Sequence, residues 1–190
     1  MPEFSELRML QPDNVILEAG EILFIRFSSS YQRDNKCYTV IIHHSLACDV
    51  AMRDASFSHN AKNEWIYVLK TTVPKDLQSF TNALFSEEKY VSILPSFNVT
   101  GNRPHDDSAY IIFRPPSVAY QLIVDFEFSR FDETKANQAE QDFYNFLIRL
   151  RNWLVEMLTI VSHKEPIYAR EGNDFAFFSC HYTSAATNYP

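Results

Sequence analysis

Apolar and polar residues alternate most regularly over residues 118–131. The apolar positions of this stretch are Tyr120, Leu122, Val124, Phe126 and Phe128. Because side chains on a strand point to alternate faces, the pattern predicts a β-strand with one face on a core and one wetter face. Other stretches rich in β-branched and aromatic residues predict strands at 15–30 (two strands and a turn), 36–44, 64–73, 109–115 and 174–182.

Two segments have the apolar spacing of α-helices. The first, residues 75–89, follows Pro74 and repeats apolar side chains at Leu77, Phe80, Leu84 and Phe85. The second, residues 133–163, follows Asp132 as a capping residue and has apolar side chains at Phe143, Leu147, Leu150, Leu154, Leu158 and Val161. Two polar, aperiodic segments remain, and they predict a loop or short helix over 45–62 and a long loop over 95–108.

The order of these elements predicts an α+β fold. We expect an antiparallel sheet of about five to seven strands, packed against one long C-terminal helix and one shorter helix. A chain of 190 residues can form one well-buried core, and no linker or repeat divides it. We therefore expect a single domain over 1–182 and a flexible C-terminal tail over 183–190. The element order resembles that of secretion chaperones and other small adaptor proteins.

Composition narrows the classes of function. With a net charge of −7 and a pI of about 5.3, the chain is repelled by phosphate groups, which disfavours binding to nucleic acids and anionic membranes. The 3 glycines lie far apart, which excludes a P-loop, a dinucleotide-binding fingerprint and a Gly-x-Ser-x-Gly elbow. Three cysteines without paired spacing, and no signal sequence or long apolar run, predict a cytoplasmic protein without disulfides.

The segment IIHHSLACDV, residues 41–50, gathers residue types that bind metals or perform nucleophilic chemistry. His43 and His44 are adjacent on a predicted strand, so they point to opposite faces and cannot chelate one metal together. A nucleophilic Cys48 needs an oriented base, and a zinc site needs three or four converging ligands. A strand end with a buried cysteine is the favoured interpretation, and a catalytic or metal-binding role for Cys48 and Asp49 with His43 or His44 is the alternative.

A second pair of candidates lies on the strand with the alternating pattern. Asp125 and Glu127 share its polar face, close enough together to hold a divalent metal for phosphodiester chemistry. A nuclease of the Asp…Glu-x-Lys type would have a lysine where Ser129 stands. A solvated sheet face with Arg130 or Lys135 nearby is therefore the favoured interpretation.

Two surfaces are candidates for contact with a partner protein. The first is the long loop, which crowds together Arg103, His105, Asp106 and Asp107. The second is an apolar flank of the long helix, outside its core-facing stripe, formed by Tyr144, Ile148 and Val155. We expect the strand 174–182 to cover this flank, or else a second copy of the chain or a client protein.

These observations favour a non-enzymatic intracellular protein-binding module of the adaptor, client-chaperone or toxin-neutralising immunity type. Its acidic surface suits a basic protein partner, and the long helix suits a homodimer; no cofactor, metal, nucleic acid or membrane is expected. The alternative is a hydrolase or nuclease that uses Cys48 with a nearby histidine, or Asp125 and Glu127 with a divalent metal. The enzyme alternative requires these groups to converge in the fold.

Overall fold

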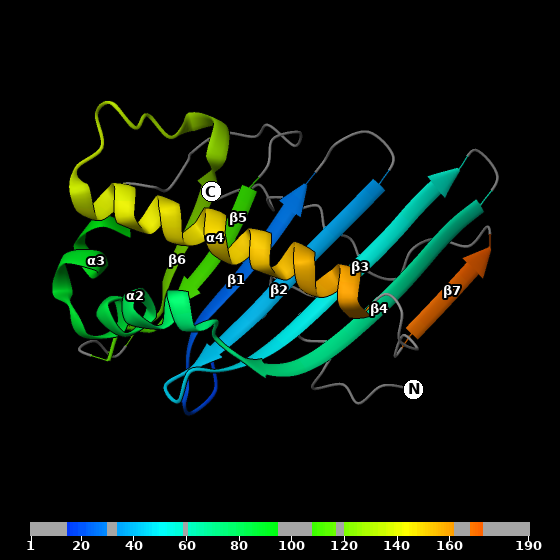
Figure 1. The fold of residues 1–190 in the computed structure, drawn as a ribbon, viewed down its shortest axis with the longest axis horizontal. Helices are drawn as coiled ribbons and strands as arrows, with labels where there is room; N and C mark the ends of the chain where they lie inside the picture. Colours follow the sequence, from blue (N-terminus) through cyan, green and yellow to red (C-terminus); the bar gives the residue numbers. More distant parts are fainter. Residues whose placement is uncertain are drawn as a thin grey trace, which may run out of the picture.

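The computed structural model of the chain describes residues 15–29, 34–58, 61–94, 108–116, 120–161 and 168–172. Within them, seven strands form one antiparallel sheet in the order β6-β5-β1-β2-β3-β4-β7 (Figure 1). The strands are β1 (Glu21–Ser29), β2 (Asp34–His43), β3 (Ala47–Ser58), β4 (Ala61–Thr72), β5 (Ser108–Phe113), β6 (Leu122–Glu127) and β7 (Tyr168–Gly172). The helices are α2 (Lys75–Ser86), α3 (Glu88–Ile93), α4 (Gln138–Val161) and the 3-10 helix η4 (Phe128–Arg130). The predicted α+β class is confirmed.

The three α-helices lie on one face of the sheet, which we call the helix face. On this face α4 crosses the strands, and α2 and α3 lie against its N-terminal half (Figure 1). The main core fills the space between, with Leu23, Val40, Val50 and Ile111 from the sheet and Leu147 and Leu150 from α4. All six side chains are fully buried. Each such side chain contributes on the order of 2 kcal/mol of burial free energy.

The opposite face, which we call the second face, is also buried at its centre. Its apolar cluster contains Phe24, Ile41, Ala51, Ile66 and Ile112. Val15 and Leu17 pack on this cluster. The Leu17 N–H donates to Gln121 Oε1 at 2.7 Å, and the Arg114 guanidinium donates to the Leu17 carbonyl oxygen. The segment predicted as the first strand of 15–30 is therefore a cover over the sheet rather than a strand.

The segment 45–62 is the clearest correction to the predicted elements. It was predicted as a loop or short helix, but it contains all of β3 and the start of β4. Cys48, Val50 and Met52 point to the helix face at the spacing of a strand. The alternation was hard to recognise because the second face there carries small and charged residues. One of these, Arg53, is only 1% exposed.

The long helix begins later than its apolar pattern predicts. The Glu140 N–H donates to Asn137 Oδ1 at 3.0 Å, and the Asn137 N–H donates to Glu140 Oε2 at 2.8 Å. This reciprocal pair is a capping box, and α4 accordingly begins at Gln138. Asp132, the predicted cap, instead accepts hydrogen bonds in the turn before the helix.

Other element bounds also differ from the predicted ones. The predicted strand 118–131 ends at Glu127 and continues as η4, and the predicted helix 75–89 is interrupted at Glu87 between α2 and α3. β7 was not predicted. The predicted strand 174–182 and tail 183–190 lie outside the described residues, so the predicted domain bounds stay a prediction.

Candidate functional site

The segment IIHHSLACDV forms the turn of the β2–β3 hairpin and the strand residues on either side of it. β2 ends at His43, the chain turns through His44 to Leu46, and β3 follows. The Leu46 N–H donates to the His43 carbonyl oxygen at 2.9 Å, and Leu46 has φ 66°, a left-handed conformation that is uncommon for leucine. In the resulting register Ile41 lies opposite Asp49. Adjacent residues of the segment therefore point to opposite faces of the sheet.

Cys48 lies on the helix face and is 1% exposed. Burial, and then the charge of Asp49, raises the pKa of its thiol to about 12. The thiolate is the nucleophilic form, so this thiol is unreactive near neutral pH. His43, on the second face, cannot act as its base. The buried cysteine predicted from the sequence is confirmed.

On the second face, His43 and Asp49 meet Glu21, the first residue of β1. His43 Nε2 lies 2.8 Å from Asp49 Oδ2, and one donor atom from each of the three side chains lies within 4.8 Å of the others. Glu21 is only 4% exposed, and the side chains of His43 and Asp49 are 27% and 26% exposed. Two carboxylates and one imidazole thus converge at the ends of three adjacent strands.

A turn and a bulge place Glu21 in this cluster. Gly20 adopts φ 89°, and the Glu18 N–H donates to Glu21 Oε2 at 2.7 Å. The His44 N–H donates to the Gly20 carbonyl oxygen at 2.9 Å, which ties the turn to the β2–β3 hairpin. The β1–β2 register shifts between Glu21 and Leu23, and such bulges redirect side chains. The sequence predicts a turn at residues 18–21. It does not reveal that Glu21 pairs with β2 and so lies beside His43.

The second pair of predicted candidates is held by an ion pair. Arg130 Nε lies 2.6 Å from Glu127 Oε2, so an arginine does lie beside the pair. The predicted solvated face is wrong for Glu127, which is only 8% exposed. Burial, and then the charge of Glu127, raises the pKa of Asp125. In the described part of the chain, no third histidine, cysteine or carboxylate joins these two to complete a metal site.

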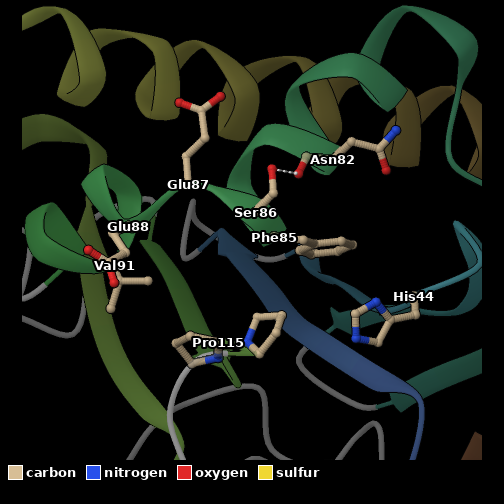
Figure 2. Close-up of a pocket in the computed structure, with 9 residues that line it drawn as sticks. His44, Asn82, Phe85, Ser86, Glu87, Glu88, Val91 and Pro115 are labelled. Atoms are coloured by element: carbon tan, nitrogen blue, oxygen red, sulfur yellow. Dashed lines mark hydrogen bonds between the residues drawn. The ribbon is translucent and has the colours of Figure 1, made fainter.

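A groove opens on the helix face where α2 and α3 meet the corner after β5. Its volume is about 600 Å³. Figure 2 shows the side chains around it, which come from His44, Asn82, Phe85, Ser86, Glu87, Glu88, Val91, Pro115 and Pro116. The buried members, Phe85 and Pro115, form an apolar floor, while the polar members are exposed and form a rim. Of the candidate residues in the segment 41–50, His44 lines this groove.

The groove has a fixed floor and an acidic rim. The Phe85 ring stacks on Phe113 with centroids 6.4 Å apart, and its edge-on contact with His44 has centroids 6.1 Å apart. Among the residues that the structure describes, those that line the groove include Glu87 and Glu88 but no lysine or arginine. Lys89 Nζ lies 2.6 Å from Glu87 Oε2, so the negative charge of Glu87 is already compensated. Glu88 is the rim carboxylate that remains for a ligand.

The apolar flank predicted on the long helix is partly covered within the chain. The Tyr144 ring stacks on Phe131 with centroids 4.2 Å apart and planes 7° apart. Ile148 is half-buried, whereas Val155 is 41% exposed. The segment after β6 therefore covers the start of the flank and leaves Val155 exposed. The predicted loop residues Arg103, His105, Asp106 and Asp107 lie outside the described residues.

No model of a known protein family matches the chain, and no curated protein or solved structure matches it. Among the helices that the structure describes, none is long and apolar enough to cross a membrane.

Proposed function

We propose that this chain is a non-enzymatic intracellular protein-binding module that holds a basic segment of another protein in the groove between α2, α3 and Pro115–Pro116. The observation that carries the proposal is the apolar floor of this groove beneath an acidic rim. Adaptors, client chaperones and immunity proteins act through such recognition. A cytoplasmic location is part of the proposal, and the free thiol of Cys48 supports it.

The arrangement of the groove matches the anatomy of a protein interface. Interfaces have an apolar centre that excludes water and a polar rim that stays accessible to it. Because the ring of Phe85 is already packed against Phe113, a partner side chain that docks on it causes little loss of conformational freedom in the groove. The Glu88 carboxylate and the net charge of −7 attract a cationic segment and repel an acidic one.

We expect peptides selected on the wild-type protein from a random display library to carry lysine or arginine beside an apolar residue. Val91→Asp should weaken their binding by about 10-fold or more, because it places a charge against the buried apolar contact. Glu88→Lys should weaken binding by about 3- to 10-fold and reduce its salt dependence. Fluorescence anisotropy with labelled peptides measures both effects.

The matched control is Glu133→Lys, which makes the same charge change on an exposed residue after β6. In the β5–β6 ladder Phe113 pairs with Leu122 and Ser108 pairs with Glu127, so Glu133 follows the end of the sheet opposite the groove. This control should bind as the wild type does. Selected peptides without a basic bias, or groove variants that bind as tightly as wild type, would contradict the proposal.

A homodimer through α4 is a second proposal for a partner, supported by the exposed Val155. If this surface joins two copies, light scattering will give the mass of a dimer for wild type and of a folded monomer for Val155→Glu. Glu133→Lys, at an exposed position outside this helix, should leave the mass unchanged. A monomeric wild type at about 100 µM excludes a dimer of micromolar affinity.

A further inference from the structure

The cluster of Glu21, His43 and Asp49 lies on the second face of the sheet, away from the groove, and the proposed function does not use it. The geometry points to a binding site for one divalent transition-metal ion, of which Zn²⁺ and Mn²⁺ are the probes to use. The site has two carboxylates and one imidazole, each from a different strand. This inference does not depend on the proposed protein-binding function.

The donor atoms lie close to the spacing that one ion requires. Metal–ligand distances of about 2.0–2.2 Å place neighbouring donors about 2.8–3.6 Å apart around one ion, from octahedral to tetrahedral geometry. His43 Nε2 and Asp49 Oδ2 are 2.8 Å apart, and all three donors lie within 4.8 Å of one another. Small rotations of the side chains therefore suffice to bring the three donors to ligand spacing.

The backbone beneath the cluster is fixed. His43 and Asp49 are held in the β2–β3 ladder, and Glu21 pairs with His43 in the β1–β2 ladder. The Glu18 N–H donates to Glu21 Oε2 at 2.7 Å. A carboxylate has enough lone pairs to accept this hydrogen bond and also bind an ion, and such hydrogen bonds orient ligand carboxylates in metal sites.

The charges of the cluster also favour a cation. Glu21 is 4% exposed, and one of its carboxylate oxygens lies within 4.8 Å of one from Asp49. Two carboxylates this close together attract a divalent cation. A divalent ion between β1 and β3 would neutralise the carboxylates of both Glu21 and Asp49.

The donor set indicates which ions fit. Magnesium and calcium prefer sites made of oxygen alone, whereas one imidazole with two carboxylates suits zinc, manganese or ferrous iron. About a quarter of the His43 and Asp49 side chains is exposed, so water can reach the remaining coordination positions. The proposed site is therefore open on one side.

The test is isothermal titration of EDTA-treated protein with ZnCl₂ and MnCl₂, with MgCl₂ for comparison. We expect one Zn²⁺ or Mn²⁺ per chain and no detectable binding of Mg²⁺. His43→Gln, Asp49→Asn and Glu21→Gln should each weaken binding by about 10-fold or more. Glu21→Gln is the sharpest variant, because glutamine keeps an oxygen that can accept the Glu18 N–H but loses the negative charge.

The matched control is His44→Ala, which removes the adjacent imidazole on the helix face and should bind the ion as wild type does. If any variant misfolds, the site can be located in the wild-type protein instead. Substoichiometric Mn²⁺ should broaden the amide NMR signals of Glu21, His43 and Asp49 before that of Val91. A wild type that binds neither Zn²⁺ nor Mn²⁺, variants that bind normally, or broadening elsewhere first would overturn the inference. The cluster would then be an ion pair beside a turn.

Discussion

Cys48 is expected to react with iodoacetamide about a thousand-fold more slowly in the native protein than in the unfolded chain. Burial, and then the charge of Asp49, raises the pKa of its thiol from 9.0 to about 12. Near pH 7 the thiolate fraction therefore falls by roughly a factor of 10³. The native rate should rise about tenfold per pH unit up to about pH 12 while the protein stays folded, whereas the unfolded rate levels off above about pH 9.

Alkylation for fixed times, followed by peptide mass spectrometry, measures this rate for Cys48 separately from that for Cys37. The same chain in urea supplies the unfolded reference. Modification of native Cys48 that is fast at pH 7 and independent of pH above it would reveal an activated thiolate. That result would restore the hydrolase alternative, in which Cys48 acts with a histidine.

The alternation over β6 was predictable because its two faces differ. Val124 and Phe126 point into the core, and Asp125 lies between them on the second face, so the sequence repeats with the period of a strand. β3 lacks this contrast, since Arg53 on its second face is as buried as Met52 on its helix face. Periodicity identifies a strand only where one of its faces is wetter than the other.

The candidate sites depend on contacts that a single sequence does not specify. That His43 and His44 diverge follows from their adjacency on one strand, and this prediction is confirmed. That Glu21 joins His43 depends on the pairing of β1 with β2 and on the bulge in β1. The groove likewise brings α2 and α3 against Pro115, which is distant in sequence. Neither the Glu21–His43 contact nor the groove is marked by a sequence motif with a fixed spacing. Neither was therefore predictable from the sequence alone.

The groove wall itself depends on a cluster of aromatic rings. The Phe80 ring of α2 lies 5.0 Å from Tyr90 of α3 and 4.9 Å from Phe146 of α4, measured between centroids. Phe146 is 2% exposed and also lies 6.4 Å from Phe143. These rings join the two helices that line the groove to the helix that packs on the sheet.

Phe146→Ala is therefore expected to lower the free energy of unfolding by about 3–5 kcal/mol, because it removes a buried ring and leaves a cavity. For a chain of this size the melting temperature should fall by about 6–20 °C. Asn145→Ala, the adjacent exposed position, should change the free energy by less than about 0.5 kcal/mol. Urea titration followed by circular dichroism measures both.

Phe146→Leu separates stability from binding, because it keeps most of the apolar volume and should stay folded while the ring contact with Phe80 is lost. If the aromatic cluster holds the groove wall in place, this variant should bind groove-selected peptides several-fold more weakly than wild type at a temperature where both are fully folded. An unfolding free energy within about 1 kcal/mol of wild type for Phe146→Ala would show that Phe146 does not clamp the helices together. Unchanged peptide affinity in Phe146→Leu would show that the groove keeps its shape without this ring.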